Sequence, residues 1–262
     1  MSLAGVTLVV ASEPTTVARR EAMEAVGCHI IPGYSSMDVT APAYACATAT
    51  GPDDLHAMTH RFAAITRPTS TAGGAHDVDA LLISSISDTV PRIALNMMTG
   101  DYGRLEARTC DCALGALGLQ THLSEIGSHE KLNSEGVTFA RSNLQQILEQ
   151  VLPARFGGTL LDYQLAEEAT DAGAVRLFLR ASPSIGPLDE AAVRDTLLHE
   201  LGRDSLLGAY QARMWEQART IEVRREDPAR TMAGKVLPLQ QVRRGDDRPH
   251  RPVIPARDRR LP

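Results

Sequence analysis

The sequence contains no apolar run that approaches the ~20 residues a helix needs to span a membrane. Its first ten residues are largely apolar, but no basic segment precedes them and no small-residue cleavage site follows, so they indicate a buried first strand rather than a signal peptide. Positive charge is not in excess either, because the formal net charge is −5, which gives no electrostatic basis for a nucleic-acid partner. These absences predict a cytoplasmic protein with neither a membrane nor a nucleic-acid partner.

Cysteine is scarce, since four cysteines among 262 residues do not make a disulfide scaffold. Cys110 and Cys112 are too close in sequence for an easy mutual disulfide and are better placed to hold a metal or to remain reduced thiols. With Cys46 and His56 upstream they offer four sulfur and nitrogen ligands of the kind that structural zinc prefers. Two alternatives stay open: His60 in place of His56, or a small core Cys46 beside a surface His56 and no metal.

The beginning of the chain indicates a strand–helix–strand unit. Val6–Ala11 is a short β-branched run, and Thr15–Val26 shows helical periodicity, with a threonine able to cap it and a glycine at its end. Cys28–Ile31 predicts a second strand, which makes Cys28 a core residue, and Pro32-Gly33 is expected to stop that strand. With 43% hydrophobic and 23% charged residues, the chain is an ordinary globular sequence whose first layer is parallel α/β.

The rest of the chain divides by pattern. Short strands broken by turns are predicted at Ala43–Ala47, Phe62–Thr66, Val78–Ser84, Ile93–Met97 and Tyr102–Ala107. The polar stretch 127–136 has no apolar period and predicts a linker. Beyond it, helical patterns at 142–152 and 188–202 and strand patterns at 159–167, 175–181 and 220–225 predict a small α+β domain. From residue 240 the chain is rich in Arg and Pro, which favours a disordered, solvated tail over a segment that binds an acidic partner.

Two short segments have the chemistry of a nucleotide site. Asp101 closes a Thr99-Gly100-Asp101 turn, and a carboxylate in a tight turn suits the hydroxyls of a ribose. Lys235 follows Gly234 far downstream, where a lone lysine suits a charge brought to a phosphate or carboxylate by a mobile element. Each has an ordinary alternative, since both short patterns are common in turns.

Two earlier segments match the same chemistry in order and spacing. Ala11-Ser12-Glu13-Pro14 resembles the Gly-Ala-Glu-Pro turn of the adenylate-forming enzymes of the acyl-CoA ligase type, where the backbone lies against adenine. Gly33-Tyr34-Ser35-Ser36-Met37-Asp38 is similar to that family's Tyr-Gly-Ser-Thr-Glu segment, in which the ring stacks on adenine and the acid helps to hold Mg²⁺. The resemblance therefore implies cofactor-binding roles for Ser12, Glu13, Pro14, Tyr34 and Asp38.

Asp101 and Lys235 complete the resemblance, as the family's ribose-binding acid and its catalytic lysine. In such enzymes a carboxylate attacks the α-phosphate of ATP, and the lysine offsets the negative charge of the transition state. Rotation of the small domain then withdraws the lysine before the acyl group passes to CoA or a carrier protein. The resemblance implies ATP/AMP and Mg²⁺ as cofactors, CoA as a candidate acceptor, and a small, aromatic or other, carboxylic acid as substrate.

The resemblance is to the phenylacetate–CoA ligase branch, whose members often carry a similar Cys…His…Cys-x-Cys set, so it also implies structural zinc on Cys46, His56, Cys110 and Cys112. We therefore expect an α/β fold: a partial large adenylation subdomain, with a mixed sheet and a short β-rich region, at 1–126. A hinge at 127–136, a small mobile α+β C-terminal domain at 137–239 and a disordered tail at 240–262 are expected to follow.

The departures from the family are informative too. Met37 replaces a threonine that donates to a phosphate oxygen, and no Ser/Thr/Gly-rich loop with a lysine lies ahead of residue 11. The chain thus resembles the C-terminal half of such an enzyme, and a complementary polypeptide or an upstream segment is expected to supply the rest. The alternatives are a non-catalytic descendant that binds nucleotide or protein, and a fragment without function.

Overall fold

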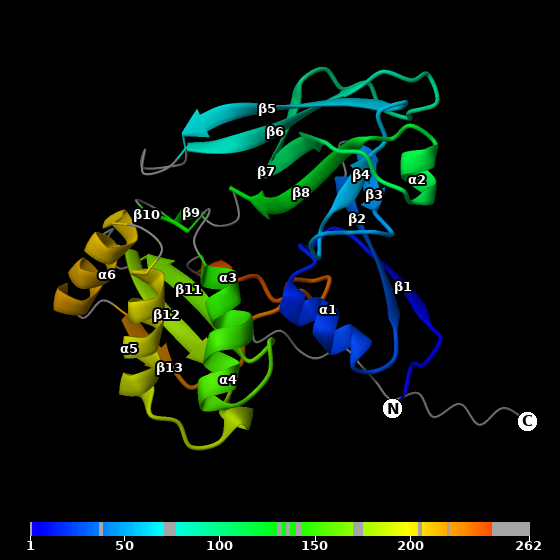
Figure 1. Cartoon of the computed structure of the whole chain (residues 1–262). Helices are drawn as coiled ribbons and strands as arrows, with labels where there is room; N and C mark the ends of the chain where they lie inside the picture. The colour runs from blue at the N-terminus through cyan, green and yellow to red at the C-terminus, as the bar shows by residue number, and fades with distance from the viewer. Residues whose placement is uncertain are drawn as a thin grey trace, which may run out of the picture.

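The computed structural model describes residues 2–36, 39–70, 77–129, 133–134, 137–139, 143–169, 175–203, 206–218 and 221–242. Within these ranges the chain forms an eight-stranded sheet, a four-stranded sheet and a two-stranded pair (Figure 1). We call the described residues up to 129 the large-sheet region and those from 143 onward the small-sheet region. The predicted class, a mixed α/β part followed by a smaller α+β part, is confirmed.

The large-sheet region begins with the predicted strand–helix–strand unit. β1 (Thr7–Val10) and β2 (His29–Ser36) pair in parallel, and α1 (Val17–Glu24) connects them. The side chain of Thr16 accepts a hydrogen bond from the Arg19 amide at 3.3 Å, which caps α1. The sheet order is β1-β2-β3-β4-β8-β7-β6-β5, and all pairs after the first are antiparallel. The other elements of this region are β3 (Thr40–Ala45), β4 (Leu55–Ala57), β5 (Phe62–Ser70), β6 (Asp77–Ser85), β7 (Met97–Ala107), α2 (Ala113–Ala116) and β8 (Thr121–Ser128).

Several predicted strand limits are wrong. β3 is Thr40–Ala45 rather than 43–47, and the strand predicted at 159–167 is Tyr163–Ala169. Pro32-Gly33 does not end β2. Pro32 is paired with Val10, the last residue of β1, so the N–H that proline lacks would fall at the end of the β1–β2 pairing and the strand can continue. Ile93–Met97 is not a strand. Asn96 adopts a left-handed φ of 45° that interrupts the extended chain, so β7 starts only at Met97.

The small-sheet region places helices against one four-stranded sheet of order β13-β12-β11-β14. Its strands are β11 (Tyr163–Ala169), β12 (Val175–Ala181), β13 (Ile221–Arg224) and β14 (Leu239–Val242). Its helical segments are α3 (Leu144–Gln146), the π-helical η1 (Ile147–Val151), α4 (Leu152–Phe156), the 3₁₀-helical η2 (Pro183–Ile185), α5 (Glu190–Leu201) and α6 (Leu206–Ala218). Between the two regions, β9 (Asn133–Ser134) pairs with β10 (Val137–Thr138). β14 contains the first three residues of the predicted tail, 240–242, which pair with β11.

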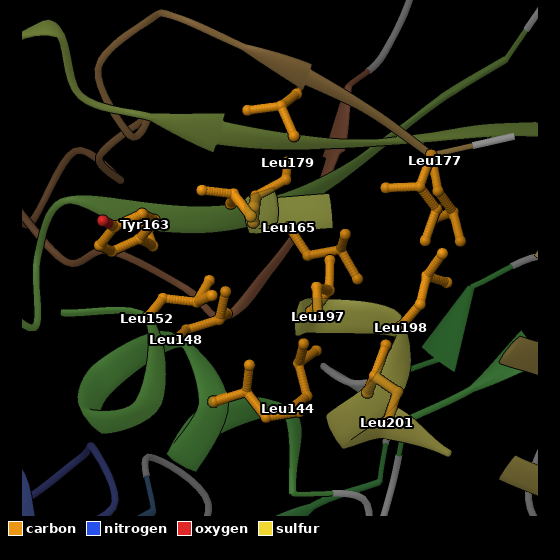
Figure 2. Packing of buried hydrophobic residues seen from close by; sticks show 14 of the residues in the cluster. Leu144, Leu148, Leu152, Tyr163, Leu165, Leu177, Leu179, Leu197, Leu198 and Leu201 are labelled. Atoms are coloured by element: carbon orange, nitrogen blue, oxygen red, sulfur yellow. The ribbon is translucent and has the colours of Figure 1, made fainter. Parts of the chain in front are cut away.

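The core of the small-sheet region is built on helical and strand periodicity. Leu144, Leu148 and Leu152 recur every four residues along α3, η1 and α4, and all three are buried (Figure 2). They pack with Leu165 and Leu179 from adjacent strands in one cluster. Burying a leucine side chain contributes roughly 1.5–3 kcal/mol, so this cluster stabilises the packing of α3, η1 and α4 on the sheet. Among the described helices none combines the length and the apolar character that a membrane crossing requires.

Candidate functional site

A pocket of about 200 Å³ lies between the large-sheet region and a loop of the small-sheet region. Its wall includes the turn after β1 and residues of β2, the place where parallel strands commonly meet a ligand. Six residues singled out in the sequence line it together: Ser12, Glu13, Pro14, Tyr34, Asp101 and Lys235. The seventh, Asp38, lies outside the described residues.

The pair Tyr34 and Asp101 forms one side of the pocket. The Tyr34 hydroxyl lies 2.9 Å from Asp101 Oδ2 and 3.0 Å from Thr99 Oγ1. Tyr34 is 7% exposed, and burial, together with the charge of Asp101, raises its pKa well above the usual range. The phenol therefore stays protonated and donates to the Asp101 carboxylate, which remains partly exposed at the pocket.

The Thr99-Gly100-Asp101 segment is not the tight turn that the sequence predicts. It lies within β7, where Gly100 has a φ of 77° that favours glycine. The Gly100 carbonyl accepts hydrogen bonds from the His129 amide at 3.1 Å and the Ser128 hydroxyl at 3.2 Å. An irregular strand, rather than a turn, therefore carries Asp101 at the pocket.

Lys235 lines the pocket beside Ser12 and Glu13. It belongs to a loop that is closed by a hydrogen bond from the Thr231 amide to the Lys235 carbonyl, at 2.8 Å. Gly234 in this loop has a φ of 82°. The Lys235 Nζ donates to the Ser12 carbonyl at 3.1 Å and lies 3.7 Å from Glu13 Oε1. The residues that meet here are 223 positions apart in the sequence.

Arg19 brings a second positive charge to the pocket wall. It forms ion pairs with Glu13 and with Glu149 of η1, the latter at 2.9 Å. The pocket also includes Asp53, which accepts the Ile126 amide at 2.7 Å. Burial raises the pKa of Asp53, and that hydrogen bond offsets only part of the rise. Glu13 therefore lies between two cations, Lys235 and Arg19, at the pocket.

A cluster of metal-ligating side chains lies elsewhere in the large-sheet region. The ligand atoms of Cys46, His56, Cys110 and His122 are all within 4.8 Å of one another. The Cys112 Sγ is next to this group, 3.0 Å from His56 Nε2. The backbone N–H of Gly115 lowers the pKa of the Cys112 thiol to about 6, which favours the thiolate.

Both histidines of this cluster are oriented by partners on their far side. His56 is fully buried, and its Nδ1 lies 2.7 Å from the Leu119 carbonyl. His122 Nδ1 lies 2.7 Å from Asp54 Oδ1, and its buried Nε2 has no hydrogen-bond partner among the described residues. His56 therefore turns its Nε2 to Cys112, and the unpartnered Nε2 of His122 is the nitrogen left to bind a metal, as in metal-binding histidines whose other nitrogen is held by a partner. Burial would raise the pKa of Asp54, but bonds from the Thr50 amide, His122 and Arg108 lower it to about 2.

These positions answer the alternatives left by the sequence. His60 is exposed and outside the cluster, and His56 is buried rather than on the surface. His122 was missed, because only the register of β4 and β8, which places it opposite His56, brings it there. Cys28 is buried, as predicted for a core residue.

Comparison with known proteins shows the fold. No family model matches the sequence, and a comparison with curated proteins found no match. The chain is similar to solved structures of AMP-forming acyl-CoA ligases. For a 2-hydroxyisobutyryl-CoA ligase in the postadenylation state, in complex with R3-HIB-AMP, the TM-score is 0.53 at 12% identity, over 90% of this chain and 48% of that one.

Two further solved structures are similar at lower scores. For apo MatB from Rhodopseudomonas palustris the TM-score is 0.42 at 12% identity, over 88% of this chain and 43% of that one. For an acyl-CoA synthetase (AMP-forming)/AMP-acid ligase II-like protein from Dyadobacter fermentans the TM-score is 0.30 at 13% identity, over 88% and 55%. This chain spans about half the length of the 2-hydroxyisobutyryl-CoA ligase, and over that span it shares the fold of an adenylate-forming enzyme.

Proposed function

We propose that this chain forms the adenylate-binding part of an AMP-forming carboxylate ligase of the phenylacetate–CoA ligase type. The observation that supports it best is that Glu13, Tyr34, Asp101 and Lys235, from four distant segments, line one pocket. The fold is shared with a ligase that was solved with an acyl-AMP bound. The reaction joins a small, aromatic or other, carboxylic acid to AMP and then passes the acyl group to CoA or a carrier protein.

Each residue has a role in that reaction. Asp101 accepts hydrogen bonds from the ribose hydroxyls, and Ser12, Glu13 and Pro14 place their backbone against adenine. Tyr34 serves as the aromatic neighbour of the base and fixes Asp101 through its hydroxyl. Asp38 is assigned to Mg²⁺ on the sequence resemblance alone.

Lys235 supplies charge at the reacting centre. A substrate carboxylate oxygen forms a bond to the α-phosphorus, the bond from that phosphorus to the bridging oxygen breaks, and pyrophosphate leaves. Negative charge grows on the phosphoryl oxygens during this step, and an ammonium group placed there stabilises the transition state more than the ground state. The Lys235 Nζ is already at the pocket, where Glu13 and the Ser12 carbonyl hold it until a phosphate takes their place.

We further propose that a complementary polypeptide supplies the remaining phosphate contacts and the acyl pocket. β1 is an edge strand of the eight-stranded sheet, and it is apolar. Val9 on β1 is 69% exposed and Ile31 on β2 is 40% exposed. An exposed apolar edge strand is a ready site for pairing with another chain.

The Cys/His cluster is proposed to bind structural zinc. Two sulfurs from Cys46 and Cys110 and two nitrogens from His56 and His122 match the tetrahedral ligand sets of such sites. Cys112, which the resemblance implies as a ligand, is close enough to be an alternative to His122. The ion would join the end of β3, which Cys46 follows directly, to β4, β8 and the segment before α2, so it would stabilise this part of the sheet.

Calorimetric titration with AMP and ATP, with and without Mg²⁺, tests the nucleotide site. Asp101→Asn removes the charge of one acceptor, and a hydrogen bond to a charged group contributes about 1.5–3 kcal/mol, so AMP should bind about 10–100-fold more weakly. Glu106→Gln is the matched control, because Glu106 lies on the same strand but is exposed and not part of the pocket lining. Equal AMP affinity for Asp101→Asn and the wild type would contradict the proposal.

A non-catalytic nucleotide-binding or protein-interaction role is the second candidate. The observation that favours it is that the proposed catalytic and ribose-binding groups already have partners, Lys235 in Glu13 and Asp101 in Tyr34. Exchange of labelled pyrophosphate into ATP, measured with the completed assembly and a carboxylate, separates the two roles. Binding of AMP without any exchange would favour the non-catalytic role.

A further inference from the structure

Glu149 is a buried carboxylate that receives hydrogen bonds from a distant part of the chain. It belongs to η1, and it is 7% exposed. Its Oε1 accepts from Arg19 Nε at 2.9 Å, and its Oε2 accepts from Thr16 Oγ1 at 2.5 Å. A third donor, Gln145 Nε2, is local, at 3.0 Å. Burying a carboxylate is costly unless donors compensate it, and most of the compensation here comes from α1 and its capping residue.

The direction of Glu149 follows from its contacts. Its neighbours Ile147 and Leu148 pack into the core of the small-sheet region, whereas the Glu149 carboxylate is bonded to Thr16 and Arg19 of the large-sheet region. Figure 1 shows α1 next to the α3–α4 segment, and the bonds to Thr16 and Arg19 join the two. Glu149 therefore connects the small-sheet region to the large-sheet region.

The same connection reaches the pocket. Arg19 pairs with Glu149 on one side and with Glu13 on the other, and Glu13 lies 3.7 Å from Lys235 Nζ. The four charged side chains thus form a series of alternating sign, which runs from Glu149 on η1 through Arg19 and Glu13 to Lys235. The small-sheet region is attached at two points, Glu149 and Lys235, to the segment 12–19.

We propose that Glu149 is a positioning residue, which holds the small-sheet region in the orientation that brings Lys235 to the pocket. This inference rests on the role proposed above for Lys235. When an anionic phosphate displaces Glu13 from Lys235, Glu13 keeps its pairing with Arg19, and Glu149 keeps the region in place. Lys235 is then free to engage the phosphate without loss of the docked arrangement.

The test follows the reactivity of the Lys235 amine, because the sequence has only two lysines, Lys131 and Lys235. The full chain is treated with an N-hydroxysuccinimide acetate ester, and mass spectrometry gives the acetylation rate of Lys235 relative to Lys131. Glu149→Gln removes the charge that holds Arg19, and we expect several-fold faster acetylation of Lys235. An unchanged rate in the folded variant would overturn the inference.

Glu200→Gln is the matched control. Glu200 lies on α5 of the same region, has a side chain that is 16% exposed, and pairs with Arg203 in its own region. Its substitution should leave Lys235 labelling unchanged, and equal acceleration in both variants would overturn the inference.

Two further measurements keep the outcome decisive. If Glu149→Gln does not fold, Arg19→Gln breaks the same contact from α1 and should accelerate Lys235 labelling equally. In hydrogen exchange, α1 and η1 should lose protection while β11 and β12 keep theirs; loss in all four elements would mean a general structural role and would also overturn the inference. Because no nucleotide is added, these results stand apart from the AMP titration, whose failure would remove the proposed function and leave the docking contact intact.

Discussion

Replacing Tyr34 by phenylalanine tests the internal order of the pocket with a change of one oxygen atom. The ring is buried with Leu55 and Leu123, and phenylalanine keeps its shape, so the variant creates almost no cavity. What is lost is the hydroxyl, which lies 2.9 Å from Asp101 Oδ2 and 3.0 Å from Thr99 Oγ1. The free energy of unfolding should therefore report the contacts of this one hydroxyl, of which the one to the charged carboxylate is the stronger.

A hydrogen bond to a charged acceptor contributes about 1.5–3 kcal/mol. The Asp101 carboxylate is partly exposed, so water can replace the missing donor, and the loss should fall at the lower end, about 1.5 kcal/mol. Urea unfolding followed by circular dichroism measures it for the whole chain. Fluorescence does not, because the single tryptophan, Trp215, packs against Phe139 and the core of the small-sheet region.

Tyr44→Phe is the control, since Tyr44 is 38% exposed and its substitution should change the free energy of unfolding by less than about 0.5 kcal/mol. If Tyr34→Phe were as stable as the wild type, or if both variants lost the same amount, the Tyr34–Asp101 contact would not hold the pocket together.

Two further predictions concern the lysine and the metal. Lys235→Ala should abolish carboxylate-dependent exchange of pyrophosphate into ATP in the completed assembly, while AMP affinity stays within a few-fold, because the ammonium acts mainly in the transition state; retained exchange would remove Lys235 from the mechanism. Elemental analysis should find about one zinc per chain, bound through four ligands, and His122→Ala should lose it while His60→Ala keeps it. A folded wild-type protein free of zinc would contradict the metal proposal. One zinc per chain in His122→Ala would mean that Cys112, rather than His122, is the fourth ligand.

Local signals account for much of the fold. The Thr16 cap, the β-branched run before it and the four-residue spacing of Leu144, Leu148 and Leu152 are all readable in the sequence, and each forms the element predicted. The limits of β2 and β7 cannot be predicted from the sequence. The course of β2 depends on where its pairing with β1 ends, at Pro32, and the start of β7 depends on the φ of Asn96.

The site divides in the same way. The resemblance to a known family predicted which residues would share a pocket. It did not predict the hydrogen bond from the Tyr34 hydroxyl to Asp101, which depends on the irregular course of β7. His122 becomes a metal ligand candidate only through strand register, and Glu149 has no sequence signal beyond being an acid in an amphipathic helix. Contacts between segments that are far apart in sequence carry no local pattern, which is why both were missed.

The most direct test of the nucleotide site is a crystal structure of this chain with AMP and Mg²⁺. The account predicts AMP in the pocket, with the ribose hydroxyls within hydrogen-bonding distance of the Asp101 carboxylate and the phosphate on the Lys235 side. An empty pocket at millimolar AMP, or AMP bound away from Asp101, would contradict the central claim.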